Sequence, residues 1–130
     1  MIGAAGTAAA VRTGRLTAAA ATEQALADIA ARDGRTNAFT AVTHERARAE
    51  AAAVDAAIAA GRDPGPLAGV PYAVKNLYDL AGLTTLAGSI IERDRPPATR
   101  DAFLVRRLHA AGAVCLGALN MDEYAYGFTT

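Results

Sequence analysis

The chain has 130 residues, a formal net charge of zero and 52% hydrophobic residues, a large share of them alanine. This length accommodates one folded domain with one core, and the balanced charge gives no indication of nucleic-acid binding or of binding to an anionic membrane surface. The single cysteine, Cys115, excludes an internal disulfide framework and is typical of a reducing compartment, so we expect a cytoplasmic protein.

The first half of the chain predicts two helices with a short strand between them. Apolar residues recur at helical spacing over residues 16–31, and Gly34 is expected to end that helix. Residues 37–42 are rich in β formers and predict a short strand. Thr43 is then expected to cap a second helix, over residues 44–60, through its side-chain oxygen.

The second half predicts a strand–helix–strand unit. Residues 69–74 form an apolar run that predicts a buried strand, with Lys75 at its carboxyl end. Residues 101–111 predict a helix and residues 113–117 predict a second buried strand, so we expect two parallel strands joined by a helical crossover. Residues 77–100, between the first of these strands and the helix, predict a long irregular loop, and a loop of this length in a compact domain indicates a functional role.

Lys75 is the only lysine of the chain. It follows a buried strand rather than a polar stretch, and ligands of α/β sheets bind beyond the carboxyl ends of strands. An amine removed from water at such a place loses its charge, and a neutral lysine accepts a proton from a hydroxyl nucleophile. Lys75 is therefore the candidate catalytic base, with an ordinary solvated lysine at a strand end as the alternative.

The polar residues near the end of the chain have a structural and a chemical interpretation. Asn120 and Glu123 have the spacing of a capping box, which predicts a short helix. Asp122 and Glu123 could form a carboxylate pair for acid–base chemistry, but their place in a first helical turn favours capping and dipole stabilisation. Cys115 lies in an apolar strand and is expected to be an inert buried thiol, and no metal-ligand spacing is present, so we expect no metal and no cofactor.

Four segments occur in a characteristic order and spacing: residues 65–76 (GPLAGVPYAVKN), 84–89 (TTLAGS), 101–114 and 120–127 (NMDEYAYG). They resemble the amidase signature family of serine hydrolases, and the resemblance extends over essentially the whole chain. It implies an α/β fold, namely the N-terminal portion of a mixed sheet flanked by helices. Residues 1–130 would then be part of a single domain, helical over residues 1–62 and α/β with the lysine over residues 63–130.

The resemblance also implies hydrolysis of a carboxamide by a nucleophilic serine, a second serine on a cis peptide bond and a lysine. Only the lysine has a counterpart here, at Lys75. The one serine, Ser89, matches a non-catalytic position, and both catalytic serines are expected in a glycine- and serine-rich segment beyond residue 130. We therefore expect a truncated amidase that is catalytically incomplete alone. Tyr126 and Gly127 match a segment along the family's substrate pocket, with a half-buried packing aromatic as the alternative for Tyr126.

Departures from the family pattern distinguish its subgroups. Asn76 stands where many members have aspartate, and Ala118-Leu119 replaces a common lysine-threonine pair. With their neighbours, these residues resemble most the bacterial hydrolases of carboxybiuret, which implies a small amide substrate and a homodimer or a small accessory subunit. Two alternatives remain, the amidase-like component of a tRNA-dependent glutamine amidotransferase and a non-catalytic interaction module. In none of them do we expect direct contact with nucleic acid or a membrane.

Overall fold

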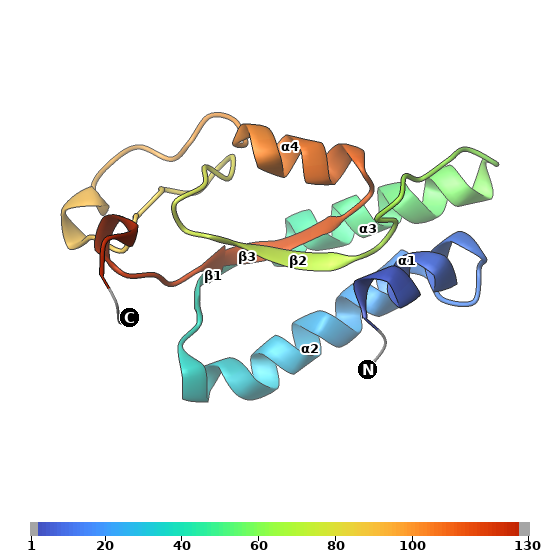
Figure 1. The fold of residues 1–130 in the computed structure, drawn as a ribbon, viewed down its shortest axis with the longest axis horizontal. Coiled ribbons are helices and arrows are strands. Elements are labelled where there is room, and N and C mark those ends of the chain that lie inside the picture. Colours follow the sequence, from blue (N-terminus) through green and yellow to red (C-terminus); the bar gives the residue numbers. More distant parts are fainter. Residues whose placement is uncertain (1–2, 128–130) are drawn as a thin grey trace.

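A three-stranded mixed sheet with helices on both of its faces organises the chain (Figure 1). The structure is a computed structural model that describes residues 3–127. In chain order its elements are α1 (Ala4–Arg12), α2 (Ala18–Thr36), β1 (Phe39–Val42), α3 (His44–Ala59), β2 (Pro71–Lys75), a single 3-10 turn (Ile90–Glu92), α4 (Phe103–Ala110), β3 (Val114–Leu119) and a second 3-10 turn (Glu123–Ala125). The predicted α/β class is confirmed.

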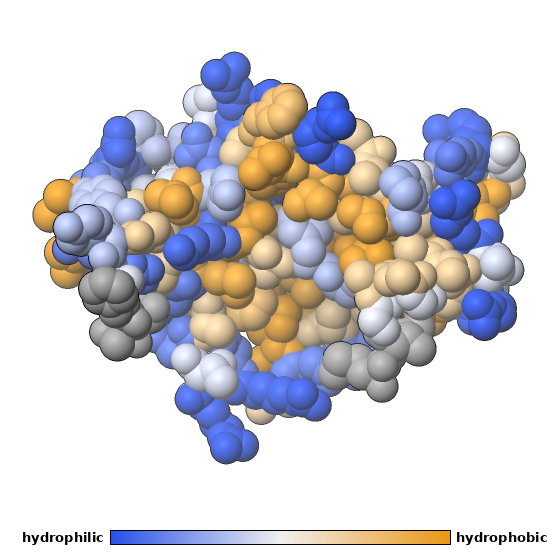
Figure 2. Space-filling view, in the orientation of Figure 1, coloured by the Kyte–Doolittle hydropathy of each residue, from blue (hydrophilic) through white to orange (hydrophobic). Residues whose placement is uncertain are grey.

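Strand β3 is the centre of the sheet, because it pairs antiparallel with β1 and parallel with β2. The parallel pairing confirms the predicted crossover through α4. From Val114 to Ala118 the strand is buried on both faces, as its apolar sequence predicted. Strand β2 differs from the prediction because it lies at the edge of the described sheet and is only half-buried. Figure 2 shows apolar side chains across the middle of the face on which β2 lies, with polar residues around them.

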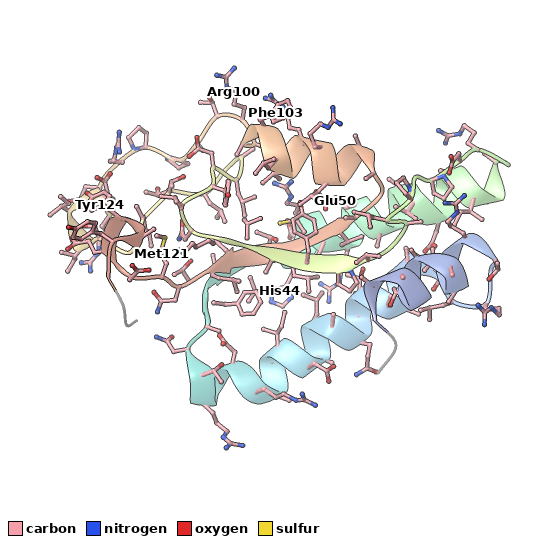
Figure 3. The ribbon with its side chains drawn as sticks, in the orientation of Figure 1. His44, Glu50, Arg100, Phe103, Met121 and Tyr124 are labelled. Atoms are coloured by element: carbon pink, nitrogen blue, oxygen red, sulfur yellow. The ribbon has the colours of Figure 1, made fainter. Side chains whose placement is uncertain are left out.

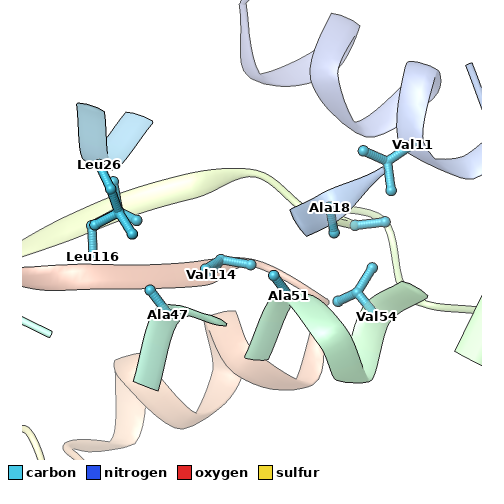
Figure 4. Close-up of a cluster of buried hydrophobic side chains, with 9 residues drawn as sticks. Val11, Ala18, Leu26, Ala47, Ala51, Val54, Val114 and Leu116 are labelled. Carbon is cyan, nitrogen blue, oxygen red and sulfur yellow. The ribbon is translucent and has the colours of Figure 1, made fainter. Parts of the chain in front are cut away.

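Two apolar clusters cover the two faces of β3, and Figure 4 shows the one that contains Val114 and Leu116. Val114 and Leu116 point toward α1, α2 and α3 and pack among small and branched residues of these helices. Cys115 points to the opposite face and packs with Val105 of α4 and with Leu80. The alternation of side chains along a strand thus assigns one layer of helices to each face. No helix within residues 3–127 is long and apolar enough to cross a membrane.

Helix α2 ends later than the sequence predicted. It continues through Gly34 to Thr36 and stops at Asn37, whose φ of 48° is left-handed. The Asp33 carboxylate explains the extension, because it accepts backbone hydrogen bonds from Ala38 (2.7 Å) and Phe39 (3.3 Å) just beyond the helix. These bonds offset the modest cost of a glycine inside a helix, about 1 kcal/mol. Helix α1 lies within residues 1–62, which the family resemblance implied to be helical, but no residue pattern predicted its bounds.

The start of α3 also differs from the prediction, because Thr43 precedes the helix without a side-chain capping bond. Its hydroxyl instead donates to the Cys115 carbonyl at 3.2 Å, and its backbone N–H donates to the Leu116 carbonyl at 2.8 Å. Further along the helix, the Glu50 carboxylate accepts the buried Cys115 N–H at 2.7 Å. Helix α3 thus satisfies the backbone of β3 where the short strand β1 has ended.

Arg46 joins three separate parts of the fold. Its Nε donates to Glu50 on the same helix at 2.8 Å, and its two terminal nitrogens donate to the Asp101 carboxylate, both at 2.7 Å. Asp101 lies just before α4 and also accepts the Ala81 N–H at 2.8 Å. The two-pronged geometry is the strong form of an arginine–carboxylate contact. The hydrogen bonds from Arg46 hold the pKa of Asp101 below its ordinary value.

We predict that Asp101→Asn destabilises the chain by about 2–3 kcal/mol at neutral pH, less than the range for breaking a fully buried pair because the site is partly exposed. The pKa of Asp101 is lowered in the folded state, so its stabilisation is present above the unfolded value of about 3.9 and is lost as the pH falls through the folded pKa. Urea unfolding of both proteins between pH 7 and pH 3 measures this difference, which should shrink at the acidic end.

Asp94→Asn is the matched control, because Asp94 is an exposed aspartate of the same loop region. It should leave the free energy of unfolding near that of the unmodified chain. A difference between Asp101→Asn and the unmodified chain that is independent of pH would contradict the role given to the ionised carboxylate.

Candidate active site

Lys75 ends strand β2, and its side chain is 44% exposed. The Nζ atom lies 3.9 Å from Oδ1 of Asp122, whose side chain is 14% exposed. The expected removal of the amine from water is therefore not met within residues 3–127. What the fold provides is a fixed place at the carboxyl end of a parallel strand and one nearby carboxylate.

Asp122 is the residue of this site that sequence reasoning assigned to a different role. The predicted helix is a single 3-10 turn, and Asp122 makes no capping bond to it. Tyr124 and Ala125 take left-handed backbone angles, with φ of 51° and 58°, so the chain cannot continue as a helix. The Asp122 carboxylate makes two other contacts instead. Its Oδ2 accepts the Gly127 N–H at 2.6 Å, and its Oδ1 faces Lys75.

The predicted capping box is also wrong, because Glu123 does not reach back toward Asn120. The Glu123 carboxylate accepts the hydroxyl of the buried Ser89 at 2.6 Å, and Asn120 accepts the Met121 N–H at 2.9 Å. The Tyr124 hydroxyl donates to Glu92 at 2.7 Å, which lowers the pKa of that carboxyl. These bonds hold residues 121–127 against the irregular segment, residues 77–100. Met121 and Tyr124 are labelled at the left of Figure 3.

Gly88 allows the irregular segment to approach Asp122 closely. Its φ is +70°, and a Cβ atom placed there would lie 2.6 Å from the Met121 carbonyl oxygen and 2.7 Å from that of Asp122. Real Cβ atoms do not come this close to backbone, so the contact requires glycine. No sequence pattern revealed this packing, because it joins residues far apart in the chain.

The two residues predicted to contact substrate lie beside this site with different surroundings. Gly127 is held by its hydrogen bond to Asp122, so it belongs to the same cluster as Lys75. Tyr126 is 92% exposed, which excludes the half-buried packing aromatic within the described part of the chain. The structure therefore brings Lys75 and Gly127 together through Asp122 and presents Tyr126 to solvent.

The remaining titratable groups near the sheet are structural. Cys115 is fully buried, as predicted, and burial raises the pKa of its thiol, which disfavours the reactive thiolate. Burial likewise raises the pKa of Tyr72, whose hydroxyl is enclosed without a hydrogen-bond partner among residues 3–127. Over the same residues, no three histidine, cysteine, aspartate or glutamate side chains are placed to hold a metal ion.

Comparison with known proteins assigns the family. The family model described as Amidase matches residues 20–130. The chain belongs to the amidase family. It is 62% identical over 120 residues to AtzE, the 1-carboxybiuret hydrolase component of Pseudomonas sp. (strain ADP), an alignment that covers 92% of this chain and 26% of that protein. It is 53% identical over 106 residues to the A component of the glutamyl-tRNA(Gln) amidotransferase of Anaeromyxobacter dehalogenans (strain 2CP-C), covering 81% of this chain and 21% of that protein.

Solved structures of amidase-family proteins share this fold. One, described as a vestigial protein complex that reveals the evolutionary origins of an s-triazine catabolic enzyme, superposes with a TM-score of 0.97 at 58% identity, over 99% of this chain and 28% of that one. The peptide amidase from Stenotrophomonas maltophilia superposes with a TM-score of 0.85 at 37% identity, over 95% of this chain and 25% of that one. This amidase-family chain thus spans about a quarter of the length of the proteins it matches.

We predict that Gly88→Ala destabilises the chain more than Gly14→Ala does. Gly14 has nearly the same φ, +71°, but a Cβ atom there would meet nothing within 4 Å. Gly14→Ala should therefore cost only the left-handed backbone strain, about 1–2 kcal/mol. Gly88→Ala should add about 1–3 kcal/mol for the clash with the two carbonyls. Urea unfolding of the two variants measures the difference, and equal losses would show that residues 88 and 121–122 are not packed as described.

Proposed function

We propose that this chain supplies the catalytic lysine of an amidase that hydrolyses a carbon–nitrogen bond in a small carboxamide. The observation that carries the proposal is the position of the only lysine, at the carboxyl end of a parallel strand in an amidase-family chain. Further support is the Asp122 carboxylate, which faces the exposed amine at 3.9 Å and is itself held by the Gly127 N–H.

In the proposed mechanism, neutral Lys75 takes a proton from the nucleophilic serine, relayed through the serine on the cis peptide bond. The serine oxygen bonds to the amide carbon, the carbon–nitrogen bond breaks, and the nitrogen leaves as ammonia after receiving that proton. Water then attacks the acyl-enzyme and releases the acid. Both serines are expected in sequence beyond residue 130. The Asp122 carboxylate lies opposite the amine that would accept the proton, 3.9 Å from its Nζ atom.

For the substrate, we propose a carboxybiuret-like amide. The support is the higher identity to the 1-carboxybiuret hydrolase component, 62%, than to the amidotransferase component, 53%, over a longer alignment. Tyr126 and Gly127 are proposed to line the substrate pocket, because both follow Asp122 on the turn that faces Lys75 and Tyr126 projects outward. The amidotransferase remains the second candidate, since its matching component aligns over most of this chain.

For partners, we propose a small accessory subunit in addition to the amide substrate. The support is that the structure with a TM-score of 0.97 belongs to a protein described as a complex. The apolar face around β2 offers surface that the rest of an amidase, or such a partner, could cover (Figure 2). A cytoplasmic location is part of the same proposal and rests on the lone buried cysteine.

We predict that Lys75→Ala, made in a protein that joins this chain to a complete amidase sequence, lowers turnover of a small carboxamide by about 10²–10⁴-fold, the usual contribution of a general base. Lys75→Arg should be equally impaired, because arginine keeps the charge but does not give up its proton. Ammonia release under saturating substrate measures the effect, and thermal unfolding checks that the variants fold.

Arg62→Ala is the control, because it removes an exposed positive charge from the loop that follows α3. It should retain full turnover. If Lys75→Ala also retained full turnover, Lys75 would not be the base, and the non-catalytic interaction module would become the better description.

A further inference from the structure

Asn76, the residue directly after Lys75, is only 4% exposed, and both its backbone and its side chain form hydrogen bonds. Its backbone N–H donates to the Leu119 carbonyl at the end of β3, and its carbonyl accepts the Ala87 N–H, both at 2.9 Å. Its side-chain Nδ2 donates to Oγ1 of Thr40 on β1 at 2.7 Å, and its Oδ1 accepts the Leu86 N–H at 3.1 Å. One residue thus ties β1, the end of β3 and the irregular segment together beside the lysine.

These bonds form the first part of a closed path from Lys75 to its partner Asp122. Asn76 holds residues 86–87, and the following Gly88 and Ser89 pack against residues 121–123 through the close backbone approach and the Ser89–Glu123 bond. The Ala87 carbonyl also accepts the Tyr124 N–H at 2.7 Å. Asp122 lies inside this packed turn and faces Lys75. A continuous set of contacts thus connects Asn76 to the turn that carries Asp122.

The pattern of donors and acceptors around position 76 matches an amide side chain. Because the Leu86 N–H is a donor, the side-chain atom of Asn76 that faces it must be the oxygen. The NH₂ group of Asn76 therefore faces Thr40. The Thr40 hydroxyl donates its single proton to the Ala118 carbonyl at 3.2 Å, so it can only accept from Asn76. A carboxylate at position 76 would need the Thr40 proton for itself, and the Ala118 carbonyl would lose its donor.

We propose that Asn76 is a positioning residue for Lys75, and that its amide bonds to Thr40 and to the Leu86 N–H keep the Lys75 amine opposite Asp122. The proposal concerns the lysine of the proposed function. It does not depend on turnover, so its test and the test of the amidase mechanism can fail separately.

The single lysine makes a direct spectroscopic test possible. Lysine labelled with ¹³C and ¹⁵N gives one set of side-chain signals in this chain, and nuclear Overhauser effects between the Lys75 Hε protons and the Asp122 Hβ protons report their contact. We expect the effect in the unmodified chain and its loss in Asn76→Ala and in Thr40→Val. Its absence from the unmodified chain would overturn the proposal.

Thr43→Val is the matched control for Thr40→Val. Both hydroxyls donate to carbonyls of β3 at 3.2 Å, Thr40 to Ala118 and Thr43 to Cys115, but only Thr40 also accepts from Asn76. Thr43→Val should keep the Lys75–Asp122 contact. If Thr40→Val and Thr43→Val both keep it, or both lose it while the core methyl signals of Val105 and Val114 stay native, the side chain of Asn76 does not position the lysine.

Asn76→Asp separates positioning from general stability. Alone, it should keep a weakened contact, because Thr40 can rotate its proton toward the carboxylate. Combined with Thr40→Val, the carboxylate has no hydroxyl proton to accept, and the contact should be lost. Equal contact intensities in Asn76→Asp with and without Thr40→Val would contradict the proposal, even if Asn76→Ala proved too unstable to measure.

Discussion

The arrangement of the sheet and helices depends on the hydrogen bonds that the Arg46 guanidinium donates to two carboxylates. The guanidinium bonds Glu50 and Asp101 at once, and Glu50 in turn accepts the Cys115 N–H from the central strand. Helix α3, the start of α4 and β3 are thereby fixed to one another by charge-assisted bonds in a poorly solvated region, where removal of one partner leaves another charge uncompensated. Through Asp101, this cluster anchors the start of α4, the helix that connects β2 to β3, against α3.

The site follows from that crossover, because it places the ends of two parallel strands side by side. Lys75 ends β2 and pairs in register with Leu119 at the end of β3. The chain leaving β2 and the chain leaving β3 therefore start from neighbouring points, and they pack together again through Gly88 and the Ser89–Glu123 bond. This geometry gives an amine a fixed carboxylate partner without burying either fully.

Local patterns predicted the parts of this structure that depend on neighbours in sequence. The apolar runs before Lys75 and around Cys115 identified both strands, and their spacing identified the crossover. The role of Asp122 was predicted wrongly because its partner, Lys75, is distant in the sequence, and helical spacing alone favoured a cap. Gly34 was taken for a helix end because the bonds from Asp33 that outweigh it reach beyond the helix. The role of Asn76 likewise depends on contacts from distant strands.

The central claim is that the amine at position 75 is itself the base, and chemical rescue tests it most directly. Lys75→Cys, in a protein that joins this chain to a complete amidase sequence, removes the amine, and treatment with 2-bromoethylamine converts the new thiol into a side chain that ends in an amine again. The buried Cys115 is shielded from the reagent, and the unmodified protein treated in the same way reports any other reaction. We predict that Lys75→Cys hydrolyses amide very slowly and recovers turnover after treatment. Rapid turnover by the untreated variant would contradict the claim.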